Sequence, residues 1–459
     1  MEHKIEDYIR PGARAHLVGV GGVSMAPLAE VLKGRGMAVT GSDMKESGTV
    51  DHLRSLGIQV TIGHLPQSVE GADCVIRTAA VHDDNPEITA ALKAGIPVFE
   101  RAQAWGAIMR HYKNALCVAG THGKTTTTSM CTHILLAAGR DPSVMLGGTL
   151  PILGAGHRVG RGDTIIAESC EYCNSFLSFA PTVAVILNVE EDHLDFFKDL
   201  EDIEQSFRKF AELTPASGGH VVANWDNANV RKTLEGVQRP LFTFSMTDRQ
   251  ASCRAENLTW ERGLPTFDIV VNGERYARVS LRVGGTHNVS NALAAASAAY
   301  VLGAPGEAVE RGLDTFTGAG RRFEKKGVYN GADVYDDYAH HPDELRALLT
   351  MAGTLGYQRV VCAFQPHTYT RTAALFDGFV DALKLAGLTV LAPIYAARET
   401  DTLGMSSQRL ALEIPGAVCL DSLEETGRYL AKIARPGDLI LTVGAGDIYL
   451  AGEAMLKKE

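Results

Sequence analysis

Long apolar runs are missing from this sequence, and no stretch in its 459 residues approaches the roughly 20 apolar residues that a membrane-spanning helix needs. The segment from Met1 to Arg10 carries charges where a signal peptide would have an apolar run. We therefore expect no membrane insertion, and we expect the protein to stay in the cytoplasm.

Positive charge is in short supply as well. The 44 Lys and Arg residues stand against 54 Asp and Glu residues, so the formal net charge is −10. Such a balance disfavours a general electrostatic affinity for nucleic acid or for an anionic membrane surface. Any phosphate group must therefore be bound by a local arrangement of donors.

Cysteines are few and scattered. Among the 8 cysteines, only Cys170 and Cys173 form a CxxC pair. A single pair with no second pair at metal spacing is a weak signal for zinc, and the surrounding residues do not resemble a redox helix. Reduced thiols packed in the protein are the favoured interpretation.

Aromatic residues are sparse at 7%, whereas 47 residues are glycine. This composition is typical of an α/β protein, in which glycines occupy turns between strands and helices. The length predicts about three domains at roughly 150 residues each. Apolar runs predict strands at 15–20, 37–41, 58–62, 73–77, 115–119, 164–168, 183–189, 332–338, 358–364, 387–393 and 438–443, separated by segments long enough for helical crossovers.

The sharpest local signal is the segment Gly120-Thr-His-Gly-Lys124-Thr125, which lies between a predicted strand and a predicted helix. Backbone amides in such a loop bind phosphate oxygens, and the lysine reaches the terminal phosphates. Thr125 is then placed to hold Mg²⁺. The match is to GxxGKT, because Val118 stands where the full phosphate-loop pattern has glycine. A simple helix cap is the alternative.

A second glycine turn, Gly19-Val-Gly21-Gly22-Val-Ser24, follows the first predicted strand. Asp43 lies 24 residues after Gly19, near the place where a ribose-binding acid is expected. A dinucleotide, another nucleotide and a purely structural turn all remain compatible with this segment.

Glu168 ends one further predicted strand, and His193 lies just after the next. The carboxyl ends of parallel strands meet at one edge of a sheet, so these residues are expected beside the phosphate loop. Together they would hold a second Mg²⁺. A packed or surface histidine is the alternative for His193.

Asn288 and Asn291 open an Ala-rich predicted helix at about 288–302. Asn288 suits either a helix cap or a contact to adenine or ribose. Arg321 and Arg322 lie at a proposed hinge, where an arginine would face a transferring phosphoryl group unless it is solvated surface.

Two polar clusters follow strands in the last third of the chain, Asp336 to His341 and Phe364 to Arg371. His340 and His367 would orient or deprotonate a substrate amine, and Arg371 would bind a carboxylate. Capping or packing is the alternative role for the histidines.

Nine segments, in this order along the chain, form a set that resembles the motifs of a known family: GVGGVSM, GTHGKTTTTSM, ESCEYCNSF, LNVEEDHLDFF, GGTHNVSNALAA, GAGRRFE, DDYAHHPDE, FQPHTYTRT and LTVGAGDIY. Together they resemble the Mur ligases, the ATP-dependent amide-forming enzymes of peptidoglycan precursor synthesis. The ordered set covers essentially the whole chain, so it is more specific than any single motif.

The resemblance implies three domains, each built on a mostly parallel sheet flanked by helices: a Rossmann-like UDP-sugar-binding domain at 1–113, a P-loop-type ATP-binding domain at 114–322 and a Rossmann-like amino-acid-binding domain at 323–459. It implies UDP-N-acetylmuramate, L-alanine and ATP as substrates, with Mg²⁺. The activity it implies joins the amino acid to the lactyl carboxylate through an acyl phosphate.

The resemblance also assigns roles to residues of this chain. Gly19, Gly21, Gly22 and Asp43 would lie at the UDP-sugar; Gly120, Thr121, His122, Gly123, Lys124, Thr125, Thr126, Asn288, Asn291 and Arg322 at ATP; Thr125, Glu168 and His193 at Mg²⁺; and Tyr338, His340, His367 and Arg371 at the amino acid. Lys124, Arg322, His340 and Arg371 would take part in catalysis. Thr368 stands where some relatives have arginine.

Three other interpretations remain open at this stage. A relative in the same class attaches a preformed tripeptide to the same sugar nucleotide. A nicotinamide oxidoreductase would use the first glycine turn and would leave Lys124 without a role. A nucleotide-sensing module would bind ATP without turnover.

Overall fold

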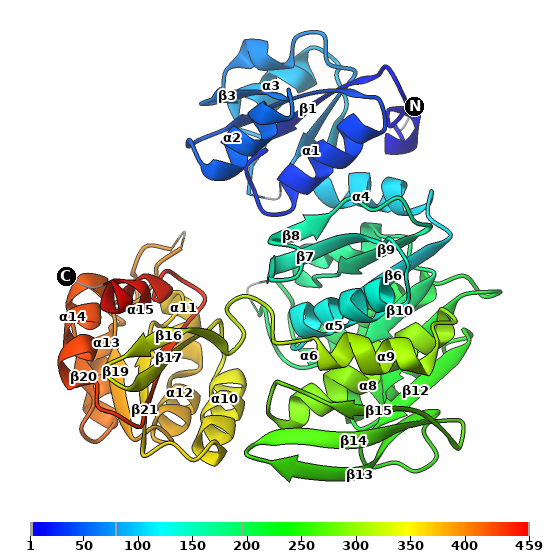
Figure 1. Cartoon of the computed structure of the whole chain (residues 1–459). Helices are drawn as coiled ribbons and strands as arrows, with labels where there is room; N and C mark the ends of the chain where they lie inside the picture. Colours follow the sequence, from blue (N-terminus) through cyan, green and yellow to red (C-terminus); the bar gives the residue numbers. More distant parts are fainter. Residues whose placement is uncertain (1–2, 79, 195, 398, 458–459) are drawn as a thin grey trace. The chain divides into compact units, whose positions relative to one another are not determined.

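The computed structural model of the chain describes residues 3–78, 80–194, 196–397 and 399–457. Its strands form three sheets of five, ten and six strands (Figure 1). The chain divides into two compact units, Met1–Glu256 with Asp268–Val279 and Ser290–Thr315, and Asn257–Phe267 with Ser280–Val289 and Phe316–Glu459. The predicted α/β fold class is confirmed, and the domain boundaries at 113/114 and 322/323 stay predictions.

The first sheet is parallel throughout, with the strand order β3-β2-β1-β4-β5. The four strands predicted before residue 78 are observed, and the first of them ends early because Gly19 turns into the left-handed region at φ +80°. Its elements are β1 (Arg14–Val18), β2 (Ala38–Asp43), β3 (Gln59–Ile62), β4 (Cys74–Arg77), β5 (Val98–Glu100), α1 (Met25–Gly34), α2 (Gly48–Ser55), α3 (Pro86–Lys93), α4 (Arg101–Met109) and the short 3₁₀ helices η1 (Ile5–Asp7) and η2 (Pro66–Val69).

The second sheet has the order β15-β14-β13-β12-β11-β10-β6-β9-β7-β8. Its strands from β12 to β7 pair in parallel, and β8 is antiparallel to β7. The strands are β6 (Asn114–Ala119), β7 (Ser143–Leu150), β8 (Ala155–Arg158), β9 (Thr164–Glu168), β10 (Val183–Ile186), β11 (His220–Asn224), β12 (Leu241–Ser245), β13 (Cys253–Glu261), β14 (Leu264–Val271) and β15 (Glu274–Ser280). The helices are α5 (Lys124–Ala137), α6 (Leu200–Glu212), α7 (Ala228–Leu234), α8 (Thr286–Val301), α9 (Gly306–Asp314) and the 3₁₀ helix η3 (Tyr172–Ser178).

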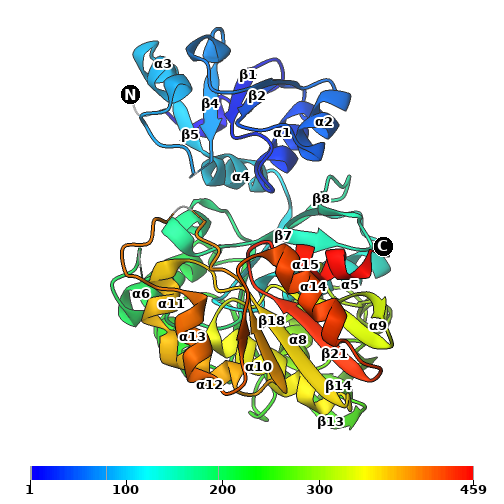
Figure 2. The ribbon, with the colours of Figure 1, turned by 90° about the vertical axis from the view of Figure 1, so that its left-hand side faces the viewer.

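The third sheet has the order β16-β17-β21-β18-β19-β20, and only its edge strand β16 runs antiparallel to its neighbour. Its strands are β16 (Glu324–Tyr329), β17 (Ala332–Asp337), β18 (Arg359–Phe364), β19 (Leu388–Leu391), β20 (Val418–Cys419) and β21 (Asp438–Val443). Its helices are α10 (Pro342–Thr354), α11 (Tyr369–Ala374), α12 (Phe376–Leu383), α13 (Ser407–Glu413), α14 (Leu423–Ile433) and α15 (Tyr449–Leu456) (Figure 2).

Apolar side chains of β18 alternate between two cores, as expected for a strand buried on both faces. Cys362 and Phe364 pack with α10 and α12, whereas Val361 and Ala363 pack with α14 and α15. Helices therefore cover both faces of the third sheet. Over the described ranges, no helix combines the length and the apolar character needed to cross a membrane.

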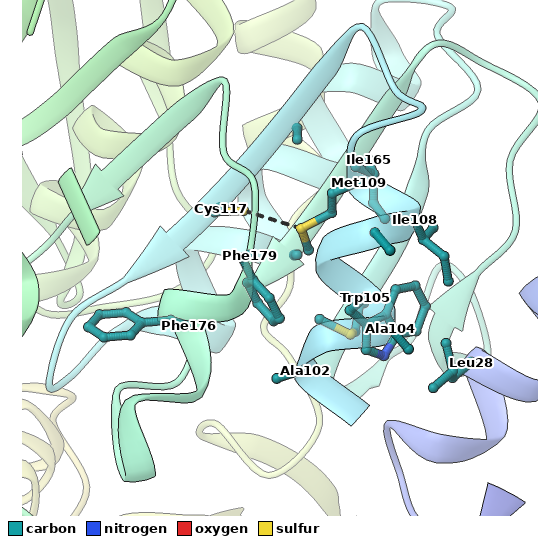
Figure 3. Packing of buried hydrophobic residues seen from close by; sticks show 14 of the residues in the cluster. Leu28, Ala102, Ala104, Trp105, Ile108, Met109, Cys117, Ile165, Phe176 and Phe179 are labelled. Carbon is teal, nitrogen blue, oxygen red and sulfur yellow. Dashed lines mark hydrogen bonds between the residues drawn. The ribbon is translucent and has the colours of Figure 1, made fainter. Parts of the chain in front are cut away.

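Helix α4 packs closely on η3, the segment that follows the end of β9. Gly106 permits this approach, because a Cβ atom there would lie 1.8 Å from the carbonyl oxygen of Ser178. Around this contact, Figure 3 shows buried side chains from α4, β6, β9 and η3, with the Cys117 thiol 3.9 Å from the sulfur of Met109. The packing fixes η3, and with it the short segment between β9 and η3.

Candidate active site

Gly120 to Gly123 form the predicted loop between β6 and α5, and Lys124 and Thr125 open the first turn of α5. Gly120 and Gly123 have φ of +151° and +84°, and a Cβ on Gly123 would lie 2.7 Å from the side-chain oxygen of Asn291. Both glycines are therefore required by backbone geometry, and Asn291 lies directly beside the loop.

Asn188, just after β10, holds the loop in shape. Its side-chain oxygen accepts the His122 N–H at 2.7 Å, its amide donates to the His122 carbonyl at 3.1 Å, and its own carbonyl accepts the Thr121 N–H at 3.2 Å. The His122 ring is half-buried, 3.5 Å from Glu190, and Thr126 is half-buried in the first turn of α5.

Lys124 is turned inward at the start of α5. Its ammonium donates to the carbonyls of Gly120 at 2.6 Å and Thr121 at 3.1 Å, and it lies 3.0 Å from the carboxylate of Glu171. Burial opposes the charge of Lys124, but the carboxylate outweighs it and raises the pKa, so the lysine is charged at neutral pH. Sequence reasoning missed Glu171, although it lies three residues after Glu168 in the segment ESCEYCNSF.

Thr125 and Glu168 are brought together as predicted. The Thr125 hydroxyl donates to Glu168 at 2.9 Å, and the other carboxylate oxygen accepts the Gly147 N–H at 2.7 Å. Hydroxyl and carboxylate oxygens are ligands that Mg²⁺ prefers, so this pair fits the ion. Taken over the residues described, no group of three or more His, Cys, Asp and Glu side chains is arranged to hold a metal.

His193 packs against Tyr172 with ring centroids 4.7 Å apart, and its Nε2 lies 3.7 Å from Asp192. Its role as a metal ligand stays a prediction. Asp195, two residues after His193, lies outside the described residues. Neither Cys170 nor Cys173 is in a disulfide, and both residues are exposed, so the expectation that these thiols are packed inside the protein is wrong.

Helix α8 begins at Thr286, two residues before Asn288. Asn288 therefore lies within the first turn, and its amide donates to the Gly284 carbonyl at 2.7 Å. The interpretation of Asn288 as the cap of this helix is wrong, because the helix starts earlier than the Ala-rich pattern indicated.

The two adjacent arginines differ sharply. The Arg321 guanidinium donates to Asp336 at 2.9 Å and to the carbonyls of Gly444 and Gly446 at 2.6 and 2.8 Å. Its planar group also lies over Tyr338 and Tyr449. These contacts give Arg321 a structural role. The prediction that an arginine of this pair faces the transferring phosphoryl group therefore applies to Arg322 alone. Arg322 lies over the Tyr338 ring, 5.1 Å from its centroid.

Tyr338, His340, His367 and Arg371 form one cluster at the carboxyl ends of β17 and β18. The His340 ring lies 5.5 Å from Tyr338 and 5.9 Å from His367, and an Arg371 Nη1 lies 3.5 Å from the Nδ1 of His367. Tyr395, which sequence reasoning missed, stacks on His367 at 5.5 Å. The predicted residues of this region are therefore close together.

Burial sets the charge states of this cluster. It lowers the pKa of His340 to about 4 against the opposing effect of Glu344, and it raises the pKa of Asp337 to about 6 against the opposing charge of Arg322. His340 is therefore neutral at pH 7. His341 caps α10 by accepting the Asp343 N–H, so the capping alternative holds for this histidine.

At the first glycine turn, Asp43 accepts the Gly21 N–H at 2.8 Å, and Gly22 N–H donates to the Gly19 carbonyl at 3.2 Å. Asp43 thus orders the turn itself. The substrate contacts predicted for these four residues stay predictions.

A buried carboxylate at the same sheet edge was not predicted. Glu87, in α3, accepts from Ser42 at 2.5 Å and lies 2.9 Å from the Nδ1 of His64 and 3.5 Å from the Nε2 of His16. Burial opposes its charge, but these partners outweigh burial and lower the pKa of Glu87 to about 2. The carboxylate links β1, β2, α3 and the loop after β3.

Three family models match successive parts of the chain. They are the Mur ligase family, catalytic domain, at residues 14–113; the Mur ligase middle domain at 118–299; and the Mur ligase, glutamate ligase domain, at 321–446. Together they cover most of the sequence.

Curated relatives match over nearly the full length. A UDP-N-acetylmuramate–L-alanine ligase of Lachnospira eligens is 48% identical over 451 residues, covering 96% of this chain and 97% of the relative. One of Acetivibrio thermocellus is 44% identical, covering 96% and 95%. The solved UDP-N-acetylmuramate-alanine ligase of Thermotoga maritima has a TM-score of 0.80 at 30% identity, covering 96% of this chain and 98% of that one. This chain therefore belongs to the Mur ligase family.

Proposed function

We propose that this protein is an ATP-dependent ligase that joins L-alanine to the lactyl carboxylate of UDP-N-acetylmuramate, in peptidoglycan precursor synthesis. The observation that carries the proposal is the near full-length similarity to alanine ligases together with Lys124 in a phosphate loop beside the Thr125–Glu168 pair. We further propose that it acts in the cytoplasm, where both nucleotide substrates occur.

In the first step, a lactyl carboxylate oxygen attacks the γ-phosphorus of ATP. The new P–O bond gives an acyl phosphate, and the bond to the β-phosphate oxygen breaks to release ADP. Loop amides around Gly123 and the charged Lys124 stabilise the phosphate oxygens, as phosphoryl transfer demands chiefly positioning and electrostatic stabilisation. Arg322 is the second cation assigned to the transferring group.

Thr125 and Glu168, together with His193, would hold Mg²⁺, which when bound offsets negative charge on the phosphate oxygens. The Thr125 hydroxyl and the Glu168 carboxylate are already within hydrogen-bond distance of each other, so their oxygens need little rearrangement to share one cation.

In the second step, the amino nitrogen of L-alanine attacks the acyl carbon, and phosphate leaves from the tetrahedral intermediate. Arg371 would bind the carboxylate of the amino acid and so orient its amine. The neutral His340 can accept a hydrogen bond from that amine, because burial keeps its ring unprotonated at pH 7.

The test is a phosphate-release assay with UDP-N-acetylmuramate, ATP and Mg²⁺. We expect release with L-alanine and none with L-alanyl-γ-D-glutamyl-meso-diaminopimelate or without an acceptor amine. Release with the tripeptide alone would replace the proposal by the recycling ligase. ATP binding without release under any condition would favour a sensing module, and tight NADH binding without ATP binding would favour the oxidoreductase.

A further inference from the structure

The three N–H donors of the Lys124 ammonium are met by three partners inside the protein. Two are carbonyls of its own loop, those of Gly120 and Thr121, and the third is the Glu171 carboxylate, whose oxygens lie at 3.0 and 3.2 Å. For Lys124 to reach a phosphate oxygen, it must exchange one of these partners for the nucleotide.

Glu171 is the partner with the largest consequence. It is 2% exposed, and the Lys124 side chain is 14% exposed, so the pair is shielded from water. Taking the cation away would leave a buried carboxylate without compensation, which is unfavourable. The pair therefore stabilises the inward position of Lys124.

The local charge balance also opposes an arriving triphosphate. Glu168 ends β9 and Glu171 lies three residues beyond it, so two carboxylates stand against the one positive charge of Lys124. A metal-free nucleotide brings only negative charge to this place, whereas a nucleotide that carries a divalent cation supplies the compensation that both carboxylates need.

We propose that Glu171 is a positioning residue that holds Lys124 within the phosphate loop until nucleotide and divalent cation arrive together, and that it thereby makes metal-free nucleotide a poor ligand. The proposal rests on the proposed function in one respect only, that ATP is the nucleotide bound.

The experiment measures the Kd of ATP by calorimetry for the full chain, once with EDTA and once with excess Mg²⁺. In Glu171→Gln, which keeps the shape but removes the charge, we expect metal-free ATP to bind about tenfold tighter than in the unaltered protein, while the Kd with Mg²⁺ moves less than about threefold. The control is Glu191→Gln, which removes the same charge from an exposed position, and there we expect both constants to stay within about twofold.

Glu171→Asp keeps the charge, and we expect it to preserve the preference for the Mg²⁺-bound nucleotide. Equal shifts of the Kd for metal-free ATP in Glu171→Gln and Glu191→Gln would overturn the proposal. Weaker binding of both metal-free and Mg²⁺-bound ATP to Glu171→Gln would overturn it as well. The unaltered protein provides a test that needs no variant, because metal-free ATP binding as tightly as the Mg²⁺ complex also overturns it. A protein that binds the Mg²⁺ complex but releases no phosphate with L-alanine refutes the proposed function and leaves this test intact.

Discussion

Replacing Arg321 by methionine tests the structural role of this residue. The substitution keeps much of the side-chain volume but leaves Asp336, which is fully buried, without its cation. Removing one partner of a buried ion pair costs about 3–5 kcal/mol. The carbonyls of Gly444 and Gly446 lose their donors as well, at about 1 kcal/mol each, while Thr442 still donates to Asp336 at 2.7 Å. Together these losses come to about 5–7 kcal/mol in the free energy of unfolding, and because Thr442 remains as a partner of Asp336 we expect the lower end, about 5 kcal/mol.

Urea unfolding followed by circular dichroism measures this loss, in a cycle of Arg321→Met, Asp336→Asn and the double variant. Because Asp336→Asn removes the charge that Arg321 compensates, the double variant should lose at least about 1 kcal/mol less than the sum of the single losses. A loss below about 1 kcal/mol for Arg321→Met, or strictly additive losses, would refute the reasoning.

Arg322→Met is the matched control at the next position. Arg322 contacts the Tyr338 ring, and its charge acts on Asp337. We expect its loss to reduce phosphate release strongly while stability changes by less than about 1 kcal/mol, as for most residues outside a buried network. Equal destabilisation by both substitutions would contradict the distinction between the two arginines.

Four further outcomes follow from the site. Lys124→Ala should lower kcat at least about 100-fold while the calorimetric Kd for the UDP-sugar stays unchanged; equal loss of UDP-sugar binding in a folded protein would contradict this assignment. Glu168→Ala and His193→Ala should raise the Mg²⁺ concentration needed for half-maximal rate, and unchanged metal dependence in both would remove them from the metal site. Gly123→Ala should weaken ATP binding, because its Cβ meets Asn291 and its φ is +84°; an unchanged Kd would show that the loop adapts. The pKa of Glu87 falls from 4.5 to about 2 on folding, so its stabilisation is present above pH 4.5 and is lost as the pH falls toward 2; Glu87→Gln should cost about 3 kcal/mol in urea at pH 7 and less at pH 3, and a constant cost would sink the idea.

Local patterns predicted the strands that lead into the phosphate loop and into Glu168. An apolar run followed by a glycine turn or an acidic residue locates the end of such a strand to within a few residues. The short edge strands β5, β8 and β20 escaped prediction, because two to four residues carry too little periodicity to be recognised.

The pairing of side chains was harder to predict. Glu171 lies 47 residues from Lys124, and Gly444 lies 123 residues from Arg321. Nothing in the sequence near Arg321 distinguishes it from Arg322, since their difference is created by β21 and the turn that follows it. Partnerships of this kind depend on the tertiary fold, which one sequence does not specify locally.

The place of β21 has a consequence for how the protein is made. Thr442 lies beside Asp336 of β17, and Val443 lies beside Phe364 of β18, so this late strand separates two strands that are synthesised much earlier. On the ribosome, β17 and β18 emerge with their inner edges unpaired and wait for β21. Such unpaired edges can form strand pairs with each other or with another nascent chain. We therefore expect this region to fold late and to be shielded by chaperones during translation.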